Sequence, residues 1–143
     1  MKRWAPFLFV LAIAMALFAE GDIPAYHSAA PPAGVKLPPI LANRQLAGPS
    51  FKRDYQVHAY ELAAKIPKVL YQLPCYCYCD RTGHKSLRTC YESTHAAKCA
   101  ACMKEAYFAY LETKKGKSPA EIRKGIIEGQ WDSIDLESAG SIN

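Results

Sequence analysis

Six cysteines between residues 75 and 102 constrain the fold of this 143-residue chain more than any other feature of its sequence. They are Cys75, Cys77, Cys79, Cys90, Cys99 and Cys102. The first three alternate with tyrosines in a C-Y-C-Y-C segment, and the last two form a C-x-x-C pair. The folded part of the chain that contains them, residues 51–131, is small enough to build only a marginal hydrophobic core, so we expect a metal ion or disulfide bonds to help hold it together.

The length and composition exclude several classes of protein. A 15.8 kDa chain is too short for a multi-domain, Rossmann-type or barrel enzyme, and it has no room for several membrane spans. Apolar residues make up 50% and charged residues 22%, as is typical of a globular chain. The net charge of +5 is moderate, and no basic groove interleaved with aromatic residues is visible, which argues against nucleic acid as a partner. No Ser-His-Asp spacing or haem-attachment motif is present, so we assign no catalytic residue and leave enzymatic activity open.

The first 19 residues have the pattern of an export signal. Lys2 and Arg3 are followed by an uncharged run from Trp4 to Ala19. A membrane-spanning helix usually needs about 20 apolar residues, so this run is marginal as a permanent anchor. We therefore expect residues 1–19 to be a signal peptide or an N-terminal anchor. The rest of the chain is then expected in the periplasm or cell envelope, with membrane contact only through this segment.

The remaining sequence divides into a linker, a folded domain and a tail. Residues 20–50 contain six of the ten prolines and many alanines, which predicts a flexible or polyproline-like spacer. Residues 51–131 contain the cysteines and the periodic apolar patterns, and we expect them to form a Cys-rich helical domain. Residues 132–143 are expected to be a loose C-terminal tail.

The periodicity of the domain predicts a small all-α bundle of about four short helices around an irregular Cys-rich loop. Apolar residues at helical spacing predict the first helix, which Ser50 can cap: they are Tyr55, Ala59, Leu62, Ala63 and Ile66. Pro67 interrupts this helix, and a second is expected over residues 68–73.

Two further helices have clear boundary signals. The third is predicted over residues 95–115, with Ser93 or Thr94 as the N-cap and Gly116 just past the end. The fourth begins at Ser118-Pro119-Ala120-Glu121, which is a capping box with proline at the first helical position. On a continuous third helix, His95, Cys99 and Cys102 lie within about 60° of one another, so they are expected to share the face that meets the C-Y-C-Y-C loop.

A metal site is the interpretation that this pattern favours. Thiolates three residues apart on a helix and a C-x-C-x-C loop can converge on one point, and soft sulfur ligands select Cu(I), Zn²⁺ or another thiophilic ion. We expect copper slightly more than zinc. The candidate ligands are Cys75, Cys77, Cys79, Cys90, Cys99, Cys102 and His95.

Two alternatives remain open on the sequence. An exported protein with an even number of cysteines can be a disulfide-stapled structural or interaction module, although a bridge within C-x-C or within a helical C-x-x-C is geometrically poor. Long-range pairs such as Cys75 with Cys99 avoid this difficulty. A thiol-disulfide redox protein that exchanges with a thiol partner protein is the other alternative, since Lys85 and Lys98 could lower a cysteine pKa.

The order of these motifs resembles that of a known family. The segment from Pro74 to Cys79, the run Gly83-His84-Lys85-Ser86-Leu87, and the later cysteines and His95 are similar to the PCYCGC-motif family, exported bacterial proteins or lipoproteins also described as CYCXC (seleno)proteins. The resemblance covers residues 55–131 and implies no established function. Selenocysteine in such relatives would be chosen for nucleophilicity or for soft-metal binding. This chain has Tyr78 where the pattern has glycine, so a different loop backbone is expected, and it lacks the cysteine that would carry a lipid.

Overall fold

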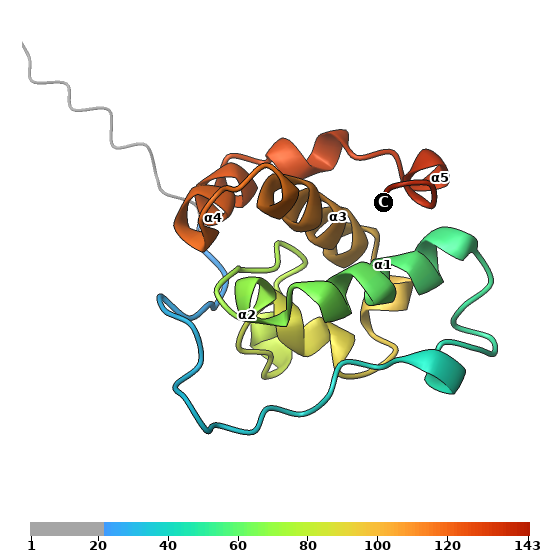
Figure 1. Ribbon diagram of the computed structural model, residues 1–143, viewed down its shortest axis with the longest axis horizontal. Coiled ribbons are helices and arrows are strands. Elements are labelled where there is room, and N and C mark those ends of the chain that lie inside the picture. The colour runs from blue at the N-terminus through green and yellow to red at the C-terminus, as the bar shows by residue number, and fades with distance from the viewer. Residues whose placement is uncertain (1–21) are drawn as a thin grey trace, which may run out of the picture.

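The computed structural model describes residues 22–143, and it is all-α as predicted: none of these residues forms a β-strand. The predicted signal peptide or anchor over residues 1–19 lies outside the described part. Five α-helices and several 3₁₀ turns (η) follow one another. The α-helices are α1 (Asp54–Lys65), α2 (Pro67–Leu70), α3 (Ala100–Lys114), α4 (Pro119–Ile127) and α5 (Leu136–Ala139). Helix α3 lies in the middle of the domain and contacts the other four (Figure 1).

Helix α1 packs one side of the core against α3. It begins at Asp54, later than a Ser50 cap would allow, because the side-chain oxygen of Gln56 accepts hydrogen bonds from the backbone N–H groups of Lys52 and Arg53, both at 2.8 Å. It buries Ala59, Tyr60, Leu62 and Ala63. Pro67 begins α2 directly after the C-cap of α1, so the proline separates the two helices as expected.

The third predicted helix is shorter than expected, which is a correction that bears on the cysteines. Residues 95–99 do not continue α3: η4 (Ala96–Lys98) is a 3₁₀ turn, and Cys99 has extended backbone and serves as the N-cap of α3. The cause lies in α1. The hydroxyl of Tyr60 accepts a hydrogen bond from the N–H of Ala97 at 3.2 Å and donates one to the carbonyl of Ser93 at 2.7 Å. These contacts satisfy backbone groups that a continuous helix would have paired internally.

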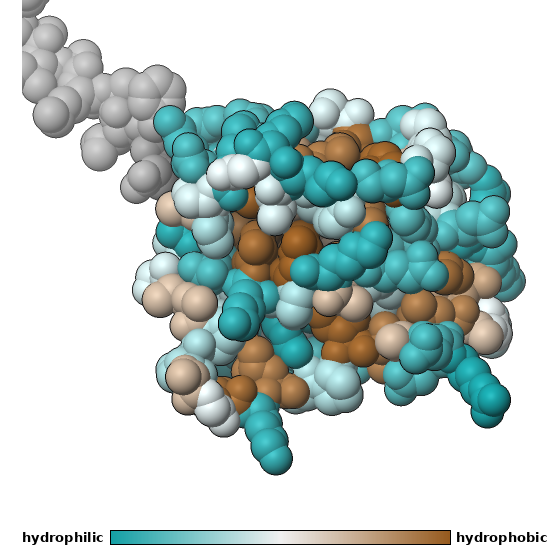
Figure 2. All heavy atoms as spheres, viewed as in Figure 1, coloured by the Kyte–Doolittle hydropathy of each residue, from teal (hydrophilic) through white to brown (hydrophobic). Residues whose placement is uncertain are grey.

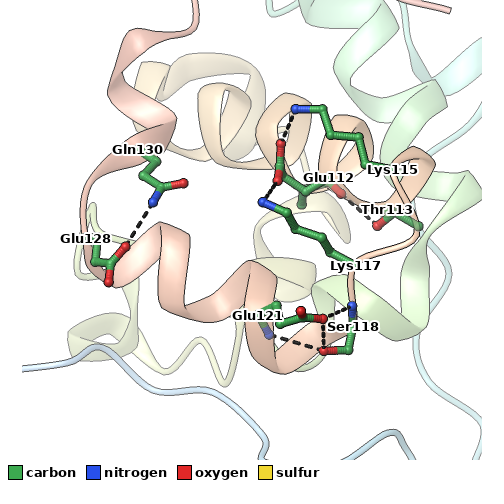
Figure 3. Close-up of polar contacts among 9 residues, drawn as sticks. Glu112, Thr113, Lys115, Lys117, Ser118, Glu121, Glu128 and Gln130 are labelled. Carbon is green, nitrogen blue, oxygen red and sulfur yellow. Dashed lines mark hydrogen bonds and ion pairs between the residues drawn. The ribbon is translucent and has the colours of Figure 1, made fainter.

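The connection from α3 to α4 follows the sequence signals. Gly116 adopts φ +82° just after α3, and the N–H of Lys117 donates to the carbonyl of Glu112 at 3.1 Å, as in a Schellman motif. The N–H of Ser118 then donates to the carboxylate of Glu121 at 2.8 Å, and the Ser118 hydroxyl accepts from the Glu121 N–H (Figure 3). The predicted capping box is therefore confirmed.

The described part of the proline-rich segment lies along the domain, unlike the flexible spacer expected from its composition. The N–H of Leu41 donates to the carbonyl of Tyr91 at 3.0 Å, and the guanidinium of Arg88 donates to the carbonyl of Pro38 at 2.6 Å. In Figure 1 this segment runs along the outside of the helices. Its extended backbone keeps its polar groups free to bond with the domain, so proline content alone does not make it a free tether.

The C-terminal residues also pack on the domain, whereas the sequence suggested a loose tail. Helix α5 contacts α1 and α3 and buries Ala139. Arg53 and Glu137 form an ion pair, and a ring nitrogen of His58 lies within hydrogen-bonding distance of the carbonyl of Ile142.

On the face shown in Figure 2, apolar patches are interspersed with hydrophilic side chains. Within residues 22–143, no helix combines the length and apolar character that a membrane crossing requires.

Candidate metal centre

Five cysteine sulfurs meet in the interior of the domain. The Sγ atoms of Cys75, Cys77, Cys79, Cys90 and Cys102 all lie within 4.8 Å of one another. Cys90 and Cys102 are fully buried, and Cys75 and Cys79 are nearly so. Three sections of chain bring them together: the loop after α2, η3 (Leu87–Tyr91) and the first turn of α3.

Three of these atoms form a nearly equilateral triangle, which we call the sulfur triangle. The Sγ atom of Cys75 lies 3.2 Å from those of Cys77 and Cys102, and Cys77 and Cys102 are 3.4 Å apart. A tetrahedral ion about 2.3 Å from each sulfur separates its ligands by about 3.8 Å. The triangle is therefore slightly tighter than a metal-thiolate site and needs only a small expansion to become one.

The loop that carries the first three cysteines turns sharply at Tyr78. This residue has φ +56° and ψ +36°, which is left-handed backbone that glycine adopts at no cost. Glycine occupies this position in the PCYCGC pattern, and here a tyrosine adopts a backbone conformation that is typical of glycine. The guanidinium of Arg81 lies 4.7 Å from the Tyr78 ring centroid and packs over it.

The turn at Tyr78 also brings Cys77 and Cys79 to disulfide-bonding distance, with Cα atoms 5.6 Å apart. This separation lies within the range of ordinary disulfides, so the geometrical objection to a C-x-C bridge does not hold for this loop. The other four cysteines, including the pair Cys75 and Cys99 considered above, are not bridged.

Cys99 lies beside the cluster but is not one of the five converging sulfurs. Because it is the N-cap of α3, it does not share a helical face with Cys102 as the sequence suggested. It is partly exposed. Hydrogen bonds from the Cys102 thiol and from the N–H groups of Cys102 and Ala101 lower the pKa of Cys99 to about 6.

Two histidines border the cluster. The Nε2 atom of His95 lies 2.9 Å from the Sγ atom of Cys79, and the Nδ1 atom of His84 lies 3.3 Å from that of Cys90. Gly83, at φ +98°, reverses the chain before His84, whose N–H donates to the carbonyl of Cys79 at 3.2 Å. Local backbone geometry thus places His84 against the loop.

The thiols share their protons unequally. Hydrogen bonds from Cys102 and Cys75 lower the pKa of Cys90 below that of an ordinary thiol and outweigh its burial. The hydrogen bonds with Cys75, Cys90 and Cys99 raise the pKa of Cys102. For Cys75, a hydrogen bond with Cys102 lowers the pKa. The hydrogen bond with Cys90, burial and the charge of Cys90 raise it by more, so the pKa of Cys75 rises to about 12. The neighbouring thiols therefore favour the thiolate form of Cys90, and a bound cation would displace their protons.

A buried carboxyl group supports the loop from α3. Glu105 is fully buried, and its Oε1 atom accepts a hydrogen bond from the backbone N–H of Tyr76 at 2.6 Å. Burial, followed by the charge of Cys75, raises the pKa of Glu105 well above its usual value.

The structure groups most but not all of the residues predicted to form the site. It brings together five of the six predicted cysteines, places His95 against one of them, and leaves Cys99 at the edge. Sequence reasoning missed His84 and Glu105 as members of the site. Their signals were weak: Glu105 follows Cys102 by three residues on one helix face, and His84 follows the glycine that turns the chain.

The arrangement could hold a soft metal ion, because several sulfur ligands converge in a buried space. It also places a thiol, that of Cys102, against a sulfur of the Cys77–Cys79 pair, which is the arrangement for thiol-disulfide exchange.

The comparisons with known proteins agree with the motif. The model of a family described as proteins of unknown function with a PCYCGC motif matches residues 49–133. No curated protein and no solved structure shows significant similarity to the chain. Since the match covers more than half of the sequence and includes the whole cysteine cluster, the chain belongs to the family of PCYCGC-motif proteins.

Proposed function

We propose that this protein binds a thiophilic metal ion, Cu(I) or Zn²⁺, through the clustered thiolates of its PCYCGC region. The observation that supports this most directly is the convergence of five sulfurs within 4.8 Å, four of them buried. Sulfur ligands favour these ions over hard cations such as Mg²⁺ and Ca²⁺. Thiolates are soft ligands, so we favour Cu(I), the softer of the two ions, slightly over Zn²⁺.

Binding at full capacity requires Cys77 and Cys79 as thiols. With a Cys77–Cys79 bond the cluster offers the thiols of Cys75, Cys90 and Cys102, and two-electron reduction of that bond adds two more. A reduced protein should therefore bind metal more tightly than an oxidised one.

The mass of the full chain tests the proposal. The reduced protein, loaded with Cu(I) or with Zn²⁺ and freed of excess metal, is weighed under native and denaturing conditions, before and after alkylation. The expected result is a metal-sized mass that is lost on denaturation, together with six alkylatable thiols. A native mass without metal after loading with either ion would overturn the proposal.

A thiol-disulfide redox function is the second candidate, because one observation favours it. Cys99 is the partly exposed N-cap of α3, and buried Cys102 lies between it and Cys77. In such a relay, the Cys102 sulfur attacks Cys77, and the proton of its thiol passes to the Cys79 sulfur that is released. The Cys99 thiolate then attacks Cys102 and releases Cys77, so two electrons pass from one cysteine pair to the other. Alkylation of Cys99 far faster than of any other thiol, with no metal bound, would favour this function.

We also propose that the chain is exported. The sequence of residues 2–19 supports this, and a Cys77–Cys79 bond is more readily kept in an oxidising compartment than in the cytosol. Cell fractionation tests it: the protein should be recovered with the periplasm or envelope and not with the cytosol.

A further inference from the structure

A second set of donor atoms lies beside the sulfur triangle. One ligand atom from each of Cys79, His84, Cys90 and His95 lies within 4.8 Å of all the others. The imidazole rings of His84 and His95 are 4.9 Å apart between centroids and meet edge to face, so both present nitrogen atoms to the same small region. None of these four residues belongs to the triangle.

We propose that these four side chains form a second metal site, a two-sulfur, two-nitrogen site for Zn²⁺, next to the thiolate site. The inference rests on the proposed function, since it assigns a second ion to the same centre. Two thiolates and two imidazoles are a common ligand set for tetrahedral Zn²⁺, whereas an ion bound by the triangle alone meets only sulfur. The mixed set therefore suits borderline Zn²⁺, and the triangle can hold either Zn²⁺ or the softer Cu(I).

The ligand count supports two sites. The five converging cysteines and the two histidines supply seven donors. The triangle uses three and the mixed set uses four, so no side chain has to serve twice. A single four-coordinate ion would leave three buried or half-buried donors without a role.

The local structure holds the mixed set in place from three directions. Cys79 begins η2 (Cys79–Thr82), and the N–H of His84 bonds back to its carbonyl. Cys90 is fixed in η3 with no exposed surface. His95 is the N-cap of η4, and its own N–H donates to the Ser93 hydroxyl at 3.2 Å. These four side chains are held close together without a metal, which lowers the entropic cost of binding one.

A bond between Cys77 and Cys79 would take one ligand from each site at once. Both sites should therefore fill only in the reduced protein. The test accordingly uses the full chain, reduced with a phosphine and freed of metal, with Zn²⁺ alone as the probe.

The experiment counts bound Zn²⁺ by native mass spectrometry and identifies its ligands by X-ray absorption. We compare the unaltered chain with the double variant His84→Asn/His95→Asn. The matched control is His27→Asn, because His27 stacks on Tyr71 and belongs to neither set of donor atoms. The expected result is two ions in the unaltered chain and in the control, with nitrogen ligands at about 2.0–2.1 Å and sulfur ligands at about 2.3 Å. The double variant should retain one ion without histidine ligands.

The possible failures are distinguishable. One ion in the unaltered chain, whatever its ligands, overturns the second site and leaves the proposed function standing. No bound Zn²⁺ or Cu(I) overturns both. If the double variant does not fold, the unaltered chain decides: two ions with imidazole ligands support the second site, and two ions with sulfur alone overturn it.

Discussion

The carboxyl group of Glu105 accepts a hydrogen bond from the backbone N–H of Tyr76 at 2.6 Å, and this contact ties the cysteine loop to helix α3 through a group that is not a cysteine. Tyr76 lies between two of the clustered cysteines, and the bond fixes the peptide unit that joins it to Cys75. The loop is thereby held close to Cys102 without metal or a disulfide bond.

Replacing Glu105 should therefore loosen the loop. Glu105→Ala leaves the Tyr76 N–H without its acceptor, and we expect the free energy of unfolding to fall by about 1–3 kcal/mol. Glu105→Gln keeps a carbonyl acceptor and should cost less. Urea unfolding of the metal-free full chain measures both. Equal losses in the two variants would contradict a role for the hydrogen bond.

The two cysteines of the C-x-x-C pair should differ in their effect on metal binding. Cys102 belongs to the sulfur triangle, whereas Cys99 caps α3 outside the five converging sulfurs. We expect Cys102→Ser to lower the affinity for the metal at least tenfold or to remove a bound ion. Cys99→Ser should leave both the affinity and the number of bound ions nearly unchanged. Competition with a chelator of known affinity measures this. An equal loss in both variants would instead make Cys99 a ligand, as the sequence suggested.

Sequence reasoning reached the fold class and the capping box because both depend on local patterns. The Ser118-Pro119-Ala120-Glu121 segment contains its own donors and acceptors, so its structure follows from residues that are adjacent in the chain.

The residue at which the third predicted helix begins could not be predicted in the same way. The bonds that satisfy Ala97 and Ser93 come from Tyr60, on a different helix, and only the folded structure shows that competition. The helical spacing that placed Cys99 and His95 on the same face as Cys102 was therefore a wrong prediction. His95 still contacts the cluster, because its ring lies against Cys79 in the cysteine loop. Glu105 was missed for a related reason, because a glutamate on a helix is usually exposed and its burial depends on distant residues.

Tyr78 allows a test of the strain in the cysteine loop. Left-handed backbone costs a residue with a side chain about 1 kcal/mol or more relative to glycine. Tyr78→Ala removes the packing with Arg81 and Tyr76 but keeps the strained backbone, so it should lower stability. Tyr78→Gly removes the same packing and relieves the strain, so it should be more stable than the alanine variant by about 1 kcal/mol. Urea midpoints compare the two, and an alanine variant as stable as the glycine variant would show that the loop does not require this conformation.

Glu112 should govern part of the loss of stability in acid. Its carboxylate is nearly buried at the end of α3 and pairs with Lys115, at 2.6 Å, and with Lys117 (Figure 3). These two lysines lower the pKa of Glu112 below its usual value of 4.5. A carboxyl group whose pKa is lower in the folded state stabilises the fold above the pKa of the unfolded chain, and this contribution disappears as the pH falls through the folded pKa.

We therefore expect Glu112→Gln to lower the free energy of unfolding near pH 7 by about 1 kcal/mol, because both lysines are partly exposed and solvent weakens their attraction. The difference from the unaltered chain should shrink as the pH falls below about 4.5. Glu128→Gln is the matched control, since Glu128 is about half exposed and its partner Lys124 is 3.8 Å away. Thermal unfolding of the metal-free full chain across this range measures the effect. A destabilisation by Glu112→Gln that is the same at pH 3 and pH 7 would show that its cause is packing and not the charge of Glu112.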